Sequence, residues 1–178
     1  LHSNQTQGFF NFPVDNLSAR KLFVEYFKKK KLKDIVVVST DEGGAKDVRK
    51  VADMLGTTFA IVHKSRPRPN VAEATHVVGD VDGKICLLYD DMIDTGGSVL
   101  SASEVLRAHG AKKEMYLAAT HPVFSGSAVE RMKEAHFTEV VVTNSIPVPA
   151  KKRFNGLTVL SIAPLFAQVI QNVHDAKS

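Results

Sequence analysis

The stretch "KICLLYDDMIDTGGSVLSASEVLRAHG", residues 84–110, decides the fold. An almost continuous apolar run over 84–89 is typical of a strand that is covered on both faces. A pattern of helical period follows over 97–110, and Gly110 stands where a C-terminal helix cap belongs. Strand, glycine-containing turn and helix in this order predict a parallel sheet if the unit repeats along the chain.

The same alternation does repeat outside this stretch. Further strands are expected at 34–40, 58–63, 115–120, 139–144 and 157–162, and further helices at 16–30, 45–55, 126–136 and 163–176. We therefore predict one α/β domain over residues 1–178, with a mostly parallel sheet and helices on both of its faces. Ligands of such sheets bind beyond the carboxyl ends of the strands, so the loops that follow strands are the candidate sites.

Composition sets the broad class of the protein. The chain has 178 residues, of which 44% are hydrophobic and 24% charged, as in a soluble globular domain. Cys86, which lies in an apolar run, is the single cysteine, so an internal disulfide is excluded. This fits a protein of a reducing compartment, and we expect a cytoplasmic location. The sequence contains no apolar run of the roughly 18 residues that a membrane span needs.

The net charge of +4 is unevenly distributed, with basic clusters at 28–33 and 63–69. Such clusters favour either a polyanionic small molecule or nucleic acid as a partner. The cluster "KKKKLK" ends a predicted helix, where cations complement the helix dipole, and no aromatic residues interleave with it for base stacking. We therefore do not expect nucleic acid or a membrane as a partner.

The turn in the opening stretch combines acids with glycines, and a phosphorylated sugar would engage both. We expect the strand to end at Tyr89, with Asp90, Asp91 and Asp94 at or just past its end. The turn that starts the next helix consists of Thr95, Gly96, Gly97 and Ser98. Its glycines let main-chain N–H groups approach a phosphate. The acids would accept hydrogen bonds from ribose hydroxyls or face a divalent cation, whereas the simpler alternative is a helix cap.

Two other loops follow predicted strands. In "VSTDEGGAKDV", residues 38–48, Asp41 precedes a glycine pair and could hold Mg²⁺, although a plain turn explains the pattern equally well. In "HKSRPRPNVAEATH", residues 63–76, Lys64 and Arg66 are suited to closing over a phosphoryl group during transfer, since charge spreads over its oxygens in the transition state. The alternative for this loop is a solvated, exposed segment.

The remaining polar candidates are weaker. The histidines show no spacing typical of a metal site, so we interpret His121 and most of the others as structural or surface residues. His2 would by itself be a frayed terminal residue. Asp15 and Asn16 are expected to cap the first helix.

Taken together, these segments resemble ribose-phosphate pyrophosphokinase, also called phosphoribosyl diphosphate synthetase. The resemblance is carried, in family order, by "TQGFFNFPVDNL" (6–17), "VSTDEGGAKDV" (38–48), "HKSRPRPNVAEATHVVGDV" (63–81), "LLYDDMIDTGGS" (87–98), "THPVFSGSAVERM" (120–132) and "VVVTNSIPVP" (140–149). Ordinary phosphoribosyltransferases share the sugar-phosphate turn, and the basic Lys-x-Arg loop distinguishes the synthetases from them.

The resemblance implies a phosphoribosyltransferase-type (type I) fold and transfer of a diphosphoryl group from ATP to the anomeric hydroxyl of ribose 5-phosphate, with Mg²⁺. By position, Lys64 and Arg66 match the residues that stabilise the transferring phosphates. The residues that match the ribose 5-phosphate site of the family are Arg66, Asp90, Asp91, Asp94, Thr95, Gly96, Gly97 and Ser98. His2 and Asp41 match a magnesium-associated pair, and Asp15 falls where some members have a metal or nucleotide contact.

The chain resembles only the second of the two similar domains of that family. We therefore expect it to be the C-terminal half of a longer chain, whose first half supplies most ATP contacts and much of a hexamer built from dimers. These residues alone would form a ribose-phosphate-binding module without activity. The alternatives are a non-catalytic regulatory relative of the synthetase and a purine-type phosphoribosyltransferase. Retention of Lys64, Arg66 and the acidic turn favours the enzyme.

Overall fold

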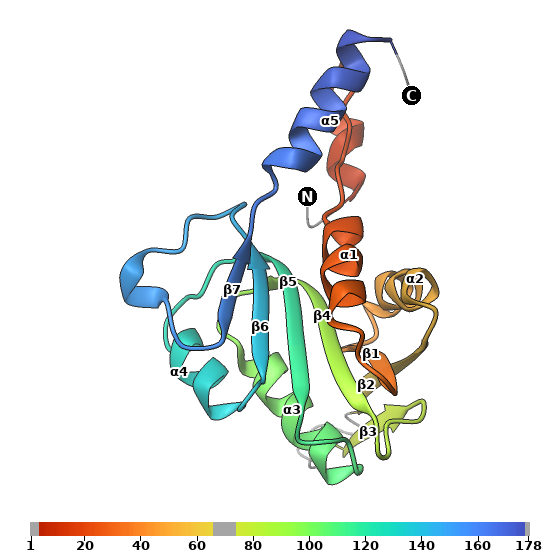
Figure 1. The fold of residues 1–178 in the computed structure, drawn as a ribbon, viewed down its shortest axis with the longest axis vertical. Coiled ribbons are helices and arrows are strands. Elements are labelled where there is room, and N and C mark those ends of the chain that lie inside the picture. The colour runs from red at the N-terminus through yellow and green to blue at the C-terminus, as the bar shows by residue number, and fades with distance from the viewer. Residues whose placement is uncertain (1–3, 66–73, 177–178) are drawn as a thin grey trace.

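A computed structural model describes residues 4–65 and 74–176, and Figure 1 shows their arrangement. The strands are β1 (Ile35–Ser39), β2 (Thr58–Ser65), β3 (Ala74–Val78), β4 (Ile85–Ile93), β5 (Met115–Pro122), β6 (Glu139–Thr143) and β7 (Leu157–Leu160). They form one sheet in the order β3-β2-β1-β4-β5-β6-β7. All neighbours are parallel except β2 and β3. The predicted mostly parallel sheet is confirmed, and the antiparallel edge strand β3 was not predicted.

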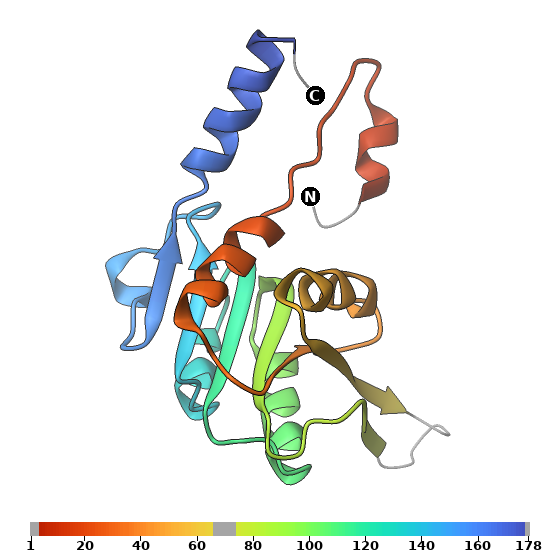
Figure 2. The ribbon, with the colours of Figure 1, turned by 45° about the vertical axis from the view of Figure 1, so that its right-hand side comes forward.

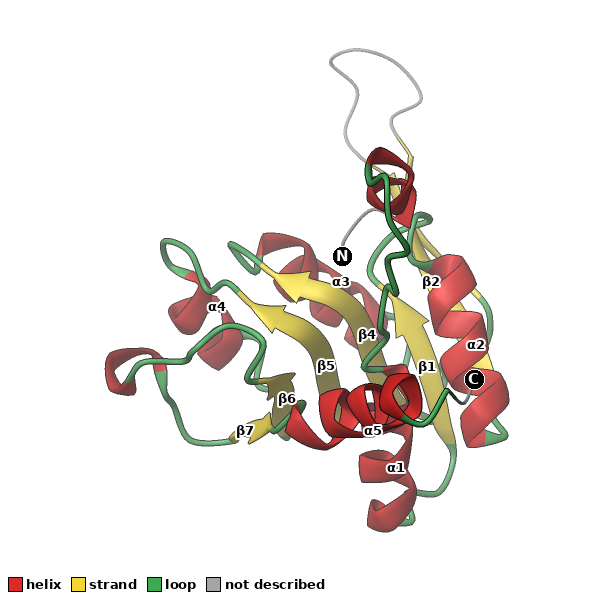
Figure 3. Ribbon diagram, turned by 90° about the horizontal axis from the view of Figure 1, so that it is seen from above, coloured by secondary structure: helices red, strands yellow, loops and turns green. Residues whose placement is uncertain are grey.

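Helices cover both faces of the sheet, as predicted. The covering helices are α1 (Arg20–Lys30), α2 (Ala45–Leu55), α3 (Gly97–Ala108) and α4 (Ala128–Glu134). The chain also forms α5 (Ala163–His174) and the short 3-10 helices η1 (Asn4–Phe9) and η2 (Ala150–Lys152). Figure 3, which is seen from above, shows α1 and α2 on one side of the sheet and α3 and α4 on the other.

The core consists of two apolar layers, one on each face of the sheet. Along β1, Val37 belongs to the layer under α1 and α2, whereas Val36 and Val38 belong to the layer under α3 and α4. Side chains of a strand alternate between the faces, so a strand covered on both faces must be apolar at every position. This is why the central strands read as continuous apolar runs rather than as alternating ones.

The predicted start of the first helix is wrong. α1 begins at Arg20, and its N-cap residue Ala19 makes no capping hydrogen bond through its side chain. Asp15 and Asn16 therefore do not cap α1, because they precede it by several residues in a segment without regular structure. Ser18 Oγ accepts a hydrogen bond from the backbone N–H of Arg20 at 3.3 Å. Compared with the predicted helix over 16–30, α1 is therefore shorter at its N-terminal end, which faces the carboxyl edge of the sheet.

Helix α5 and the segment around η1 extend away from the sheet, as Figures 1 and 2 show. None of the residues of α5, all of which are described, is buried. Its apolar side chains Phe166, Ile170 and Val173 are 48%, 67% and 68% exposed, and Phe9 and Phe12 of the N-terminal segment are 87% and 64% exposed. Over residues 4–65 and 74–176, no helix combines the length and apolar character that crossing a membrane requires.

Candidate functional site

The candidate site lies where the carboxyl ends of β1 and β4 meet. After β1 the chain adds β2 and β3 on one side, and it then crosses to add β4 and the later strands on the other side. A reversal of this kind leaves a crevice between the two strand ends, and ligands of open α/β sheets bind in such crevices. A cleft of about 500 Å³ lies there, lined by residues from the start of α1, the loop after β1, and the ends of β4 and β5.

Asp90 and Asp91 lie within β4, not beyond it. The strand continues to Ile93, which pairs with Pro122 of β5, so the expected end at Tyr89 is wrong. Leu88 and Ile93 pack in the same core layer although five positions separate them, so the strict alternation of a strand is broken between them. Both consecutive aspartates consequently reach the same cleft, which a regular strand would not permit.

Asp90 is held in place by two donors. Thr40 Oγ1, just after β1, donates a hydrogen bond to Asp90 Oδ2 at 2.8 Å, and the backbone N–H of Asp91 donates to Oδ1, also at 2.8 Å. The pKa of Asp90 is raised to about 6, chiefly by burial and to a smaller extent by the neighbouring Asp91 carboxylate, while the bonds from Thr40 and from the Asp91 N–H oppose the shift. The site therefore contains a carboxyl group whose charge is sensitive to a bound hydrogen-bond donor or cation.

The loop after β1 places Asp41 in the same cleft. Its Oδ1 accepts a hydrogen bond from the backbone N–H of Gly44 at 3.1 Å, and Ser39 Oγ donates to its main-chain oxygen at 2.6 Å. A Cβ atom at Gly44 would lie 2.4 Å from Ser39 Oγ, so this tight turn requires glycine. One carboxylate oxygen is thus used by the turn, and the second suits a hard cation such as Mg²⁺, which needs only one or two protein carboxylates.

The turn Thr95–Ser98 joins the end of β4 to α3 on the same edge of the sheet. Gly96 is the N-cap residue of α3 and has φ of 76°, a left-handed conformation that favours glycine. Arg131 of α4 fastens the turn, since its Nη1 donates to the Thr95 carbonyl oxygen at 2.8 Å. The backbone N–H of Ser125 donates to the Asp94 carbonyl oxygen at 3.0 Å. Asp94 and Thr95–Ser98 come directly after the end of β4 in the chain, but they are not among the described residues that line the cleft.

The structure describes only some of the other predicted site residues. His2 and Arg66 lie outside the described residues, as does the side chain of Lys64, whose backbone belongs to β2. Asp15 is exposed, and its neighbour Asn16 lines the cleft. Within residues 4–65 and 74–176 there is no group of three or more His, Cys, Asp or Glu side chains that could hold a metal ion. The predicted roles of these residues remain predictions.

Several residues of the cleft were missed by sequence reasoning. Arg20 lines it and donates from Nη2 to Asp47 Oδ1 at 2.8 Å. Thr120 and His121, at the end of β5, line it as well. His121 was interpreted as a structural or surface residue, because it belongs to no metal-ligand spacing. Its place at the carboxyl end of a predicted strand was the signal that could have identified it.

Comparison with known protein families gives one match that covers most of the chain. Residues 66–178 match the model of the phosphoribosyl synthetase-associated domain. Ribose-phosphate pyrophosphokinases of Bacillus caldolyticus and Bacillus subtilis are each 48% identical over all 178 residues, which cover 56% of each relative. The chain therefore spans slightly more than half the length of these curated relatives.

Solved structures give the same picture. Phosphoribosylpyrophosphate synthetase from Mycobacterium smegmatis is similar over 99% of this chain and 57% of its own, with a TM-score of 0.89 and 46% identity. Adenine phosphoribosyltransferase from Giardia lamblia is similar over 80% of this chain, with a TM-score of 0.53 and 20% identity. The latter likeness concerns the fold alone and confirms the predicted phosphoribosyltransferase-type fold.

Proposed function

The chain belongs to the family of phosphoribosyl synthetase-associated domains, and from this premise we propose that it forms the ribose 5-phosphate half of a ribose-phosphate diphosphokinase. The reaction transfers the diphosphoryl group of ATP to the anomeric hydroxyl of ribose 5-phosphate. The hydroxyl oxygen bonds to the β-phosphorus, the bond between that phosphorus and the α-phosphate oxygen breaks, and AMP leaves. The hydroxyl proton is released, and the sugar product is phosphoribosyl diphosphate.

The observation that carries the proposal is the meeting of Asp41, Asp90 and Asp91 in one cleft at the ends of β1 and β4. The glycine turn before α3 lies on the same edge of the sheet. A sugar phosphate needs acceptors for its hydroxyls and main-chain donors for its phosphate, and this edge offers both.

Each residue of the site has a proposed role. Thr95, Gly96, Gly97 and Ser98 bind the 5-phosphate through main-chain N–H groups and hydroxyls, and Asp94 lies beneath the sugar. Asp90 and Asp91 accept hydrogen bonds from the ribose hydroxyls. Lys64 and Arg66 stabilise the charge on the phosphoryl oxygens during transfer, and Arg66 also contacts the sugar phosphate.

Asp41 and His2 are the proposed magnesium-associated residues, and Asp15 is a further candidate for a metal or nucleotide contact. The exposed carboxylate of Asp41 fits a hard cation that retains water and phosphate ligands. Mg²⁺, when bound with ATP, would neutralise charge on the phosphate oxygens. The protein's own contribution is to hold the sugar's anomeric hydroxyl in line with the phosphoryl group, which lowers the entropic part of the barrier.

We further propose that residues 1–178 correspond to the C-terminal half of a two-domain subunit that assembles into a homo-oligomer. The chain spans only 56% of the Bacillus caldolyticus relative and 57% of the Mycobacterium smegmatis synthetase, which supports this organisation. The exposed apolar residues of α5 and of the segment around η1 also support it, since surface patches of this kind are typical of interfaces.

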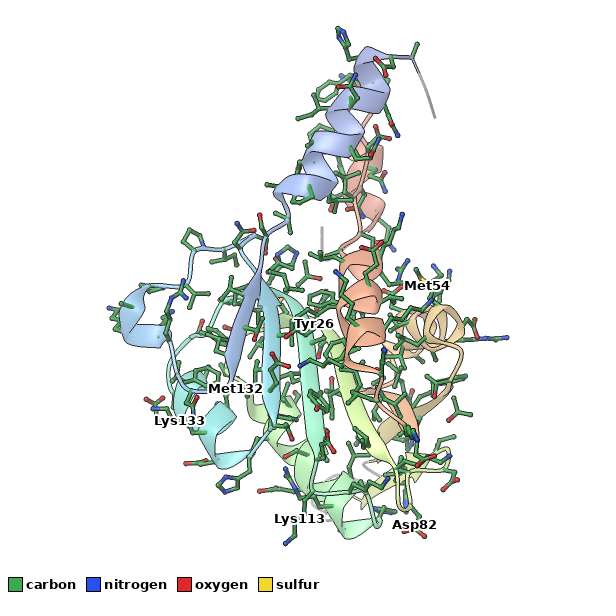
Figure 4. All side chains as sticks on the ribbon, viewed as in Figure 1. Tyr26, Met54, Asp82, Lys113, Met132 and Lys133 are labelled. Atoms are coloured by element: carbon green, nitrogen blue, oxygen red, sulfur yellow. The ribbon has the colours of Figure 1, made fainter. Side chains whose placement is uncertain are left out.

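The test is AMP formation by the intact protein incubated with ATP, Mg²⁺ and ribose 5-phosphate. We expect AMP from the unmodified protein, and we expect Lys64→Ala to reduce turnover by roughly 10³-fold or more with little change in ribose 5-phosphate affinity. Lys113→Ala is the control, because Lys113 is an exposed lysine at the opposite end of the molecule from α5 (Figure 4). Tight sugar-phosphate binding without AMP would instead favour a regulatory relative.

A further inference from the structure

We propose that Arg131 is a phosphate-binding residue, whose guanidinium group contacts the 5-phosphate of the bound sugar together with the turn Thr95–Ser98. The proposal rests on the proposed function, because it adds a side chain to the same phosphate site. Arg131 lies on α4, more than thirty positions after the turn, and the sequence analysis did not identify it as a site residue.

The space in front of Gly97 is bordered by two hydrogen-bond donors. The nearest atoms to a Cβ placed at Gly97 are Arg131 Nη1 and Thr95 Oγ1, both at 3.9 Å. The volume that a side chain would occupy there is therefore open, with a guanidinium nitrogen and a hydroxyl oxygen at its border. A phosphate oxygen that approaches the main chain past Gly97 comes within reach of both donors.

The contact between Arg131 and the turn leaves most of the guanidinium available. Nη1 donates to the Thr95 carbonyl oxygen at 2.8 Å, which uses one of the five N–H groups of the side chain. Within residues 4–65 and 74–176, Arg131 forms no ion pair with a carboxylate. The bond to an uncharged carbonyl thus fixes the position of the guanidinium without neutralising its charge.

The turn is also held to α4 and to the loop before it by contacts that carry no charge. The backbone N–H of Ser125 donates to the Asp94 carbonyl oxygen at 3.0 Å. A Cβ at Gly96 would lie 2.8 Å from Met132 Cε, so the Met132 side chain packs directly against Gly96. A main-chain bond and apolar packing support the turn, and the positive charge of Arg131 therefore serves a purpose other than support.

The electrostatics of the turn favour a cation at this place. Asp90, Asp91 and Asp94 precede the turn, and carboxylates this close in the chain disfavour a doubly charged phosphate. The N-terminus of α3 offers only a partial positive charge of about half a unit. A guanidinium adds a full charge and forms short, paired hydrogen bonds with phosphate oxygens. Arg131 would thus offset the carboxylates beside the phosphate.

Two substitutions at position 131 separate the charge from the rest of the side chain. Arg131→Gln removes the charge but keeps an amide donor, whereas Arg131→Lys keeps the charge and loses the planar fork. We expect Arg131→Gln to raise the Kd for ribose 5-phosphate roughly 10- to 100-fold, the effect of one lost charge-assisted hydrogen bond. Arg131→Lys should recover part of the affinity. Titration calorimetry with the intact protein measures both.

The ionisation of the bound phosphate gives a readout that does not depend on activity. A phosphate monoester loses its second proton with a pKa of about 6, and an adjacent cation lowers this pKa because it favours the doubly charged form. In a ³¹P titration of ribose 5-phosphate bound to the intact protein, we expect a pKa below that of the free ester. The pKa should rise in Arg131→Gln and stay low in Arg131→Lys.

Two residues of the same helix, both labelled in Figure 4, provide the controls. Lys133 is an exposed cation two positions from Arg131, about 200° round the helix, so Lys133→Gln should change neither the Kd nor the phosphate pKa. Met132→Ala removes the packing against Gly96 without removing charge. It should lower the Tm but leave the phosphate pKa low. An equal rise of this pKa in Met132→Ala and Arg131→Gln would contradict a direct contact from Arg131.

The outcomes also separate this proposal from the one on which it rests. If the unmodified protein fails to bind ribose 5-phosphate, the proposed function is wrong and the role of Arg131 falls with it. If it binds, and Arg131→Gln has the same Kd and phosphate pKa, the role of Arg131 is wrong and the proposed function stands. A bound phosphate that titrates like the free ester in the unmodified protein would also overturn the role of Arg131, even if the variants prove too unstable to assay.

Discussion

At the scale of single residues, Gly96 and Gly97 have different reasons to be glycine although they are neighbours. Gly96 has φ of 76°, and a Cβ atom there would lie 2.8 Å from Met132 Cε, a buried side chain of α4 (Figure 4). At Gly97 φ is not in the left-handed region, and the nearest atoms to a Cβ, on Arg131 and Thr95, are 3.9 Å away. The fold needs glycine at the first position only.

This difference yields a test of the phosphate turn. We expect Gly96→Ala to lower the free energy of unfolding by about 1–2 kcal/mol, the cost of a left-handed conformation for a residue with a side chain. Gly97→Ala should leave unfolding unchanged but weaken ribose 5-phosphate binding, because its methyl group blocks the main-chain approach of the phosphate. Urea unfolding and calorimetric titration measure the two effects. Unaltered binding by Gly97→Ala would remove the turn from the site.

Asp90 provides a prediction that depends on pH. Its folded-state pKa of about 6 lies above the ordinary value of 3.8, chiefly through burial, so ionisation of this carboxyl destabilises the folded protein. The cost is fully present above pH 6 and disappears as the pH falls through the ordinary value. We expect Asp90→Asn to raise the free energy of unfolding by on the order of 1–3 kcal/mol at about pH 8, to have little effect near pH 3.5, and to weaken ribose 5-phosphate binding.

The matched control for this variant is Asp53→Asn, which removes an exposed carboxylate from α2. It should change the free energy of unfolding by no more than about 0.5 kcal/mol at either pH. A less stable Asp90→Asn protein at high pH would show that the hydrogen bonds from Thr40 and Asp91 outweigh the cost of burying the charge.

At the scale of elements, Glu139 connects α1 with β6 and β7. Its carboxylate accepts hydrogen bonds from Tyr26 and Thr158 hydroxyls, and it pairs with Lys30 Nζ at 2.7 Å. Burial alone would raise the pKa of Glu139, but the bonds from Lys30, Thr158 and Tyr26 outweigh it and hold the pKa below the usual range. Tyr26 stands on α1 in Figure 4. This cluster fixes the helix whose N-terminal end borders the cleft.

We expect Glu139→Gln to lower the free energy of unfolding by about 2 kcal/mol at neutral pH, since it leaves Lys30 without its half-buried partner. A carboxyl group whose pKa is lower in the folded than in the unfolded protein stabilises the fold at pH values above its unfolded-state pKa. This stabilisation is lost as the pH falls through the folded-state pKa. The difference between the two proteins should therefore shrink below about pH 4.5. Chemical unfolding over a pH series measures it.

Glu25→Gln is the control for Glu139→Gln. Glu25 pairs with Lys21 on the exposed side of the same helix at 4.0 Å, and both side chains are more than half exposed. Exposed pairs contribute little, so we expect a change within about 0.5 kcal/mol. Equal effects of the two substitutions would mean that burial does not strengthen the Glu139 cluster.

At the scale of the whole molecule, the apolar side of α5 is the feature that the domain itself does not use. We expect the double substitution Ile170→Ser with Val173→Ser to leave the thermal unfolding of residues 1–178 unchanged, because both side chains are exposed. In the intact protein it should lower the sedimentation coefficient or the Tm, because the lost apolar contacts would belong to an interface. Gln171→Ser, on the same helix, should do neither. An unaltered intact protein would argue against an interface on α5.

The sequence alone determined the succession of strands and helices and the loops at which a ligand was expected. Apolar periodicity reports the burial of each segment, and it is a local property, so β1, β6 and α2 were placed nearly to the residue, whereas the polar end of β4 was missed. The acidic turn was recognised because its residue types and their spacing are local as well. The antiparallel edge β3 and the late start of α1 carried no such local pattern.

Only the tertiary structure decided which of these loops meet. β1 and β4 are separated in sequence by α2, β2 and β3, yet they are neighbours in the sheet, and this brings Thr40 against Asp90. The raised pKa of Asp90 and the contact between His121 Nδ1 and Ser145 Oγ depend likewise on burial and on partners distant in the chain. Contacts between distant residues follow from the packing of the whole sheet, and no local pattern encodes them.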